Sequence, residues 1–236
     1  RSIIFDTGAI ISLSINNLLW LGQPLKEKFK GEFFIPKEVK LELVDNPLQS
    51  LKFKLEALQV LAEVAKGNLK FYEHSLQKEV ESLGRLVNSV FEARGRPIKI
   101  AHEGELAVIA LAKRINADAL VIDERTIRAL IEDPKSLGKL LESRLHTEVR
   151  INKDKINKIR DYTKKLKVIR SAELGVIAYE MGLMDRYVLS GMEDYAGGDL
   201  RKKVLEGMLW GLKFRGCAIS QDEIVDLLKL EGFTPL

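Results

Sequence analysis

Cysteines, histidines and long hydrophobic runs are scarce in this sequence, and each scarcity excludes a class of protein. One cysteine, Cys217, in 236 residues excludes a disulfide framework and a multi-cysteine zinc site. The three histidines, His74, His102 and His146, show no paired spacing, so zinc chemistry is not expected. No apolar run approaches the roughly 18 residues of a membrane span, and no signal-peptide pattern is present. We therefore expect a soluble, cytoplasmic protein with no membrane contact.

Neither sign of charge dominates the chain. Lys and Arg number 38 against 34 Asp and Glu, which gives a net charge of +4. This mild basicity is compatible with a nucleic-acid partner but does not establish one. Hydrophobic residues make up 46% of the chain, which is ample for a buried core.

A second aspartic-protease motif is also missing. The stretch "IIFDTGAII" (residues 3–11) carries Asp6, Thr7 and Gly8 after an apolar run, as an aspartic protease does. Those enzymes need two carboxylates that share a proton, from a second such motif or from a small all-β dimer, and this chain has one motif and many helical patterns. A phosphatase of the haloacid dehalogenase type would want Asp at the position of Gly8. Neither class fits.

Buried strands and amphipathic helices alternate along the chain. The run "SIIF" (2–5) is apolar without alternation, which is typical of a strand covered on both faces in a parallel sheet. A second strand is predicted in "GEFFIP" (31–36), and a buried strand that ends at Asp123 in "DALVIDERT" (118–126). Helices are predicted in "IPKEVKLELV" and "HEGELAVIALAKRINA", and further strands at "TEVRI" and "KVIRS" around a basic helix. The predicted fold is α/β, a Rossmann-like three-layer sandwich with a central parallel sheet.

Two segments are predicted to lie outside that core. Residues 46–97 contain two amphipathic stretches, each closed near a glycine, and are predicted to form an inserted helical hairpin. Residues 198–236 are predicted to form a helical C-terminal extension, which leaves residues 1–45 and 98–180 as the catalytic core. The hairpin is expected to serve a partner or self-association, because its apolar residues exceed what two helices bury against each other: Leu55, Leu58 and Leu61 on one arm, and Leu83, Leu86 and Val90 on the other.

Two aspartates fall at the carboxyl ends of predicted parallel strands. Asp6 ends the first strand and Asp123 ends "ALVID", and ligands of open α/β sheets bind at this edge. Taken singly, an aspartate after a strand is commonly a turn or helix-capping residue. Together they indicate a ligand-binding site at the carboxyl edge of the sheet.

Two glutamates share helical stripes with apolar residues. Glu42 lies on the side of Val39 and Leu43, and Glu105 on the side of Val108, Ile109 and Ala112, whereas Glu103 projects to nearly the opposite side. A single inward glutamate is often paired with Lys or Arg. Four carboxylates converging on one sheet edge instead predict a site for Mg²⁺ or Mn²⁺, because hard cations prefer carboxylate oxygens and buried carboxylates need neutralising.

These motifs, in this order, resemble the PIN-domain nuclease family, which includes the VapC-like toxins of toxin–antitoxin pairs. The resemblance rests on "IIFDTGAIISL", on Pro36, Val39 and Glu42 in "IPKEVKLEL", on Glu105 in "GELAVIALA", and on Asp123 in "ALVIDERTIRAL". It covers roughly residues 1–45 and 98–180. It implies a metal-dependent nuclease that acts on single-stranded RNA. The chain departs from the family at Gly8, where Ser or Asn is frequent, and in "IDERTIR", which has no further Asp.

The resemblance implies catalytic, metal-binding and phosphate-contacting roles for these residues. Asp6, Glu42, Glu105 and Asp123 would be both the catalytic residues and the ligands of Mg²⁺ or Mn²⁺. Thr7 either orients a water or phosphate oxygen or closes the turn after the strand, and Arg125 and Arg128 would contact phosphate.

Partners and a second function class are also predicted. An antitoxin or other protein partner, and a homo-oligomer, are expected beside RNA. The alternative function is a PIN-like nucleic-acid-binding or scaffold protein that keeps the acidic pocket but cleaves little.

Overall fold

Strand β1 (Ser2–Phe5) lies at the centre of a five-stranded sheet in the computed structural model, which describes residues 1–234. The strand order is β3-β2-β1-β6-β8, and every neighbouring pair is parallel. The bounds of the other four strands are β2 Glu32–Pro36, β3 Lys70–Tyr72, β6 Ala119–Val121 and β8 Lys167–Ile169. All four residues of β1 are buried, as the absence of polar alternation predicts. The predicted α/β fold with a central parallel sheet is confirmed.

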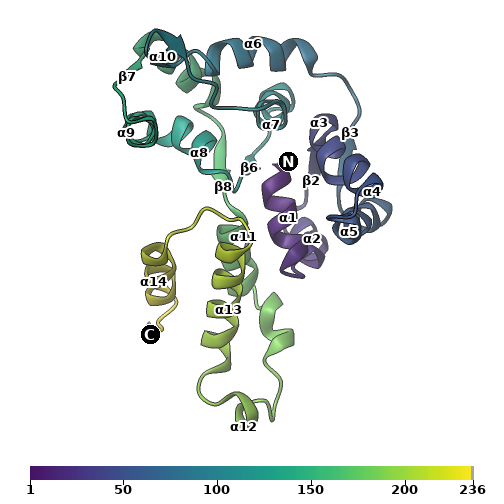
Figure 1. Cartoon of the computed structure of the whole chain (residues 1–236). Coiled ribbons are helices and arrows are strands. Elements are labelled where there is room, and N and C mark those ends of the chain that lie inside the picture. Colours follow the sequence, from purple (N-terminus) through teal and green to yellow (C-terminus); the bar gives the residue numbers. More distant parts are fainter. Residues whose placement is uncertain (235–236) are drawn as a thin grey trace.

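Helices flank this sheet (Figure 1). Helix α7 (Glu103–Ile115) packs on β1, β2 and β6, with α6 (Gln77–Val87) outside it. Helices α1 (Thr7–Ile15), α5 (Lys54–Ala65) and α11 (Ser171–Glu180) form a second group, in which α1 contacts both others. The remaining helical elements are η1 Leu19–Leu21, α2 Gly22–Phe29, α3 Lys37–Lys40, the π-helical η2 Leu41–Asp45, α4 Asn46–Gln49, α8 Arg125–Glu132, α9 Pro134–Leu145, α10 Lys153–Thr163, η3 Leu183–Tyr187, α12 Glu193–Ala196, α13 Leu200–Phe214 and α14 Gln221–Leu230.

A second, smaller sheet lies apart from the first. Its three antiparallel strands have the order β5-β4-β7, with β4 at Phe91–Ala93, β5 at Arg96–Pro97 and β7 at Val149–Ile151. The strand predicted in "TEVRI" is therefore present as β7, but it pairs with β4 rather than with the parallel sheet.

Residues 46–97 do not form a helical hairpin, so that prediction was wrong. Between α5 and α6 the chain forms β3, which pairs in parallel with β2 and extends the central sheet. Helix α6 packs against α7, and its Leu83 is only 4% exposed. The apolar residues of that arm thus face the core, whereas Leu55 and Leu58 of α5 are exposed. This segment belongs to the α/β fold because both of its halves contribute to the sheet and its helical cover.

The C-terminal segment is helical over most of its length. Helix α13 packs on α11, and α14 packs on α13. The last two residues of the predicted extension 198–236 lie outside the described residues. Within residues 1–234, no helix combines the length and the apolar character needed to cross a membrane.

A pair of leucine substitutions tests whether α6 belongs to the core. Leu83→Ala should lower the free energy of unfolding by about 2–4 kcal/mol, because it removes a buried side chain and leaves a cavity. Leu58→Ala, at a position 51% exposed, should cost less than about 1 kcal/mol. Urea unfolding measures both. Equally small losses would make α6 a dispensable attachment.

Candidate active site

Asp6 lies where β1 ends and α1 begins. Its backbone N–H donates to the carbonyl of Val121 at 3.0 Å, which fixes it beside the end of β6. Its carboxylate caps α1 by accepting from the N–H of Gly8 at 3.3 Å. The residue is 4% exposed. Asp6 is therefore both a helix cap, as a lone strand-end aspartate commonly is, and a buried acid at the carboxyl edge of the sheet.

Asp123 lies beside Asp6, on the neighbouring strand. A Cβ atom placed on Gly8 would lie 3.4 Å from Oδ2 of Asp6 and 3.7 Å from Cβ of Asp123, so both aspartates border this glycine. Asp123 is 2% exposed, and both of its carboxylate oxygens accept hydrogen bonds from Ser171, one from the N–H and one from the hydroxyl, each at 2.7 Å. Ser171 begins α11 directly after β8, so three adjacent strand ends meet here.

Glu42 approaches this edge from η2. Its Oε2 accepts a 2.6 Å hydrogen bond from the hydroxyl of Thr7, so the Thr7 side chain points toward Glu42. A Cβ atom on Gly104 would lie 3.2 Å from Oε1 of Glu42, so the carboxylate rests against the first turn of α7, where the helix dipole favours a negative charge. Glu42 is exposed, however, while Val39 and Leu43 are buried. The predicted shared stripe was wrong for Glu42, because the π-helical turn departs from the α-helical spacing.

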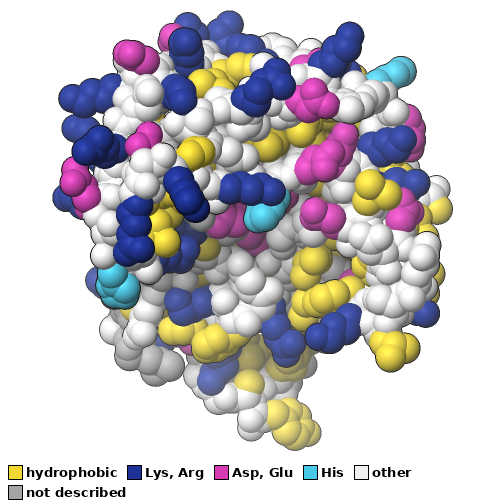
Figure 2. All heavy atoms as spheres, turned by 45° about the horizontal axis from the view of Figure 1, so that its top comes forward, with side chains coloured by type: hydrophobic (Ala, Val, Ile, Leu, Met, Phe, Trp, Pro, Cys, Tyr) yellow, Lys and Arg dark blue, Asp and Glu magenta, His cyan; other side chains and the backbone are white. Residues whose placement is uncertain are grey.

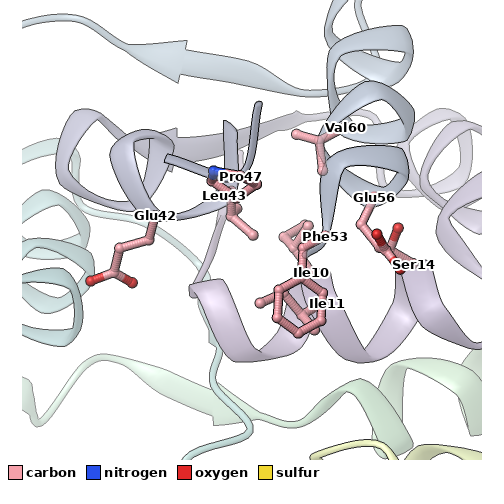
Figure 3. A pocket seen from close by; sticks show the side chains of 9 residues that line it. All are labelled: Ile10, Ile11, Ser14, Glu42, Leu43, Pro47, Phe53, Glu56 and Val60. Atoms are coloured by element: carbon pink, nitrogen blue, oxygen red, sulfur yellow. The ribbon is translucent and has the colours of Figure 1, made fainter. Parts of the chain in front are cut away.

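Figure 3 shows the surroundings of Glu42. Its carboxylate points away from an apolar pocket lined by Ile10, Ile11, Leu43, Pro47, Phe53 and Val60. Acidic and apolar surfaces therefore adjoin at η2.

Glu105 reaches the same edge from the first turn of α7. It is half-buried, and its Oε2 accepts from the backbone N–H of His102, the residue that precedes the helix, at 2.6 Å. Glu103, two residues before it, is exposed. The helical spacing thus separates the two glutamates in the predicted sense, and His102 occupies the N-cap position of α7.

The acids of this edge perturb one another. Burial, reinforced by the charges of Glu105 and Glu42, raises the pKa of Asp6 to about 7. Burial also raises the pKa of Glu105, and the carboxylate of Glu124 adds to that rise. None of the salt bridges formed among residues 1–234 involves Asp6, Glu42, Glu105, Asp123 or Glu124. Among the described residues, these carboxylates therefore lack an ion-pair partner, and the charge of His102 only partly offsets the rise at Glu105.

The donor set suits a hard divalent cation. All four predicted ligands are carboxylates, which Mg²⁺ and Mn²⁺ prefer, and a bound cation would offset the burial and the neighbouring charges that raise the pKa of Asp6. In the described part of the chain, however, no three acids, histidines or cysteines are grouped closely enough to form a metal-binding cluster. The chemistry of the donors fits the ion, and the side chains would have to draw together around it.

Comparison with known proteins identifies the family. The sequence family DUF3368, described as a PIN domain, matches residues 2–134. The chain belongs to the PIN-domain family. No curated protein and no solved structure matches it significantly. The matched residues of the PIN domain contain Asp6, Glu42, Glu105 and Asp123, and they also include 46–97. PIN domains are generally nucleases and typically use divalent metal ions.

Helix α8 carries the two arginines predicted to contact phosphate. Arg125 is exposed at its first position, next to the acidic edge. Arg128 lies one turn further, with its Nε 3.4 Å from Oε2 of Glu132. A phosphate contact stays a prediction for both. Glu124, which the sequence reasoning missed, caps α8 by accepting from the N–H of Ile127 at 2.8 Å. It adds an acid to the stretch "IDERTIR", which has no further Asp.

Residues beyond the matched part of the PIN domain hold Asp123 in place. The N–H of Ala218 donates to the backbone carbonyl of Asp123 at 3.2 Å, and Arg170 Nη1 donates to the carbonyl of Ala218 at 3.0 Å. Arg170 is 6% exposed and pairs with Glu173 and with Glu223 of α14. Sequence reasoning missed Ser171 and Arg170, although both follow the strand "KVI", where the strand-end rule could have found them.

Cys217 lies in the same segment. It is a free, buried thiol, and burial raises its pKa to about 12, with the charge of Asp123 adding to the rise. The thiol therefore stays protonated near neutral pH. A buried, protonated cysteine packs as a small apolar residue.

A pH series on Asp6→Asn tests the electrostatic strain. A folded-state pKa of about 7, against 3.8 in the unfolded chain, means that the unfolded state binds fewer protons between those values, so the metal-free parent loses stability as pH rises from 4 to 7. Asn caps a helix as well as Asp does, so the variant should exceed the parent by at most about 4 kcal/mol above pH 7 and match it near pH 4.

The matched control is Asp133→Asn at the exposed cap of α9. Hydrogen bonds from Ser136 lower the pKa of Asp133, so its removal should not stabilise the protein as pH rises. Urea unfolding in EDTA from pH 4 to pH 8 gives both curves. A pH-independent difference between Asp6→Asn and the parent would show that Asp6 is ionised without strain.

Proposed function

We propose that this PIN domain is a metal-dependent endoribonuclease that hydrolyses phosphodiester bonds in single-stranded RNA. The observation that carries the proposal is the set of acids at the carboxyl edge of the sheet, which form no ion pair within the described part of the chain and in which the pKa of Asp6 is raised to about 7. RNA is chosen as the substrate because the resemblance to the family implies it.

Asp6, Glu42, Glu105 and Asp123 would hold Mg²⁺ or Mn²⁺, and the bound ion would supply an activated water and charge stabilisation at the phosphate. The chain's own residues prepare the ligands. Thr7 orients Glu42 through its hydroxyl, and Ser171 fixes both oxygens of Asp123. Gly8 leaves the space between the two aspartates free of a side chain, so that a phosphate can approach. Hydrolysis would leave a 5′-phosphate and a 3′-hydroxyl.

A basic surface for the substrate adjoins these acids. Figure 2 shows acidic side chains in the hollowed centre of one face, with Lys and Arg side chains gathered beside them. Phosphate contacts from such side chains supply most of the affinity for nucleic acids. Arg125 and Arg128 are proposed to contribute from α8.

One observation favours a second function, a PIN-like nucleic-acid-binding or scaffold protein with little activity. Both oxygens of Asp123 already accept hydrogen bonds from Ser171, which leaves this carboxylate less free to coordinate an ion. Metal-dependent turnover separates the two functions, since a scaffold need not show it.

An exposed apolar surface supports a protein partner, such as an antitoxin, or a second copy of the chain. Leu51 is fully exposed, and Phe53, Leu55 and Leu58 beside it are between 43% and 67% exposed. Contiguous exposed apolar residues of this size are typical of interaction surfaces.

The proposed activity is tested by a matched pair of glutamates. Glu105→Gln should lower Mn²⁺-dependent cleavage of a single-stranded RNA at least about 100-fold, because it removes a proposed metal ligand. Glu103→Gln, at the exposed neighbouring position, should retain activity within about twofold. Equal losses at both positions would contradict the assignment of Glu105.

Thermal melts test the ion independently of turnover. Mn²⁺ at about 100 times its Kd should stabilise the parent by roughly 2.7 kcal/mol, because it binds the folded state preferentially. The melting temperature of Asp6→Asn should respond much less. A response as large as the parent's would remove Asp6 from the ligand set.

A further inference from the structure

The hairpin of β4 and β5 is the part of the small sheet that carries free positive charge. Arg94 and Gly95 form its two-residue turn, and Ala93 pairs with Arg96 across it. Both Arg94 and Arg96 are exposed, and in the described part of the chain neither side chain takes part in an ion pair or hydrogen bond. On the paired strand β7, Arg150 stands opposite Glu92, so the unbalanced charge lies at the turn.

The backbone of this turn is unusual for an arginine. Arg94 has φ +51° and Gly95 φ +74°, the left-handed values of a type I′ hairpin turn, for which Asn-Gly is the preferred pair. A long side chain at the first position is strained where Asn would not be. A strained residue with an exposed, unpartnered charge is typical of a functional position rather than of one selected for stability.

The hairpin is rigidly joined to the acidic edge. Phe91 of β4 is fully buried, and its carbonyl accepts from the N–H of Ile98 at 2.8 Å. Asn88 then holds the following segment, because its Oδ1 accepts from the N–H groups of Ile100 and Ala101 at 2.8 and 2.9 Å. His102, which donates to Glu105, comes next. His102 follows Arg96 by six positions, which limits their separation to roughly 20 Å.

The surface view agrees with this connection. In Figure 2 the Lys and Arg side chains gather on the side where Figure 1 places β7, α9 and α10, next to the central acidic hollow. A polyanion on these basic side chains would run toward the carboxylates.

We propose that the β4–β5 hairpin is a phosphate-contact site for single-stranded RNA, with Arg94 and Arg96 as the contacting residues. The inference rests on the proposed function for its choice of ligand, but it requires binding only. Arginine suits this role because its planar fork donates two hydrogen bonds to one phosphate. A strand held at the hairpin would extend toward Glu105 along residues 98–102.

The test exploits the strain at Arg94. Arg94→Asn places the preferred residue in the type I′ turn, so the variant should melt at the parent's temperature or roughly 2 °C above it. Its Kd for a fluorescent single-stranded RNA 12-mer in EDTA should rise about three- to tenfold, because a phosphate contact is lost. The slope of log K against log NaCl concentration should shrink by about 0.7 for Arg94→Asn, and by about 1.4 when Arg96→Gln is added.

Lys30→Asn is the matched control. Lys30 also has a left-handed backbone, with φ +53°, and it is exposed at the end of α2, just before β2 begins and therefore at the opposite edge of the sheet. Its substitution removes the same charge and inserts the same residue. It should change the RNA Kd less than twofold and leave the salt slope unchanged.

Equal effects of Arg94→Asn and Lys30→Asn would overturn the inference, as would a parent that binds no RNA at 50 mM NaCl. If Arg94→Asn melts well below the parent, Arg96→Gln alone decides the matter, because Arg96 lies in an ordinary strand conformation. Binding that depends on Arg94 in a protein without metal-dependent cleavage would refute the nuclease proposal and keep the hairpin site. Metal-dependent cleavage by a protein whose RNA binding does not depend on Arg94 would refute the hairpin site and keep the nuclease proposal.

Discussion

The burial of the Asp6 carboxylate is the constraint on which the rest of the site depends. Two structural demands fix Asp6: its N–H completes the pairing of β1 with β6, and its carboxylate caps α1. Neither interaction brings a positive charge to the carboxylate. Its burial therefore disfavours the ionised form, and the pKa of Asp6 is raised. Asp123, Glu105 and Glu42 then approach from a neighbouring strand and two further helical elements. The fold thus concentrates acidic groups at one place, where a bound cation or the protonation of Asp6 can neutralise the charge.

Much of this arrangement could be predicted from the sequence, because it follows from local periodicity. A strand without polar alternation indicates burial on both faces, and parallel neighbours bring their carboxyl ends together, which places Asp6 beside Asp123. A spacing of 100° per residue separates Glu105 from Glu103. The same rule failed for Glu42, because the π-helical turn at Leu41–Asp45 changes the spacing that the rule assumes. Periodicity is a sound guide only where the helix is regular.

The errors in the fold arose where the structure depends on distant pairing. Strand β3 has three residues, and its partly exposed side chains give no strong apolar signal. It forms because β2 offers an edge, and a short strand is determined by its neighbour more than by its own residues. Strand β7 was visible in the sequence, but its partner β4 lies far away in the chain. The buried side of α6 is likewise defined by α7, which a reading of α6 alone could not supply.

The same dependence on distant residues limits what the PIN-domain match by itself can explain. The matched residues end at position 134, yet the carboxylate of Asp123 is held by Ser171, and its carbonyl by Ala218. Ala218 is in turn held by Arg170, which is anchored by a glutamate on α14. The C-terminal helix α14 is therefore linked, through an ion pair and two hydrogen bonds, to the backbone of one of the four proposed ligands. The segment predicted as an extension thus supplies Ala218 and Glu223 to the contacts that hold Asp123, so the position of Asp123 depends on residues from distant parts of the chain.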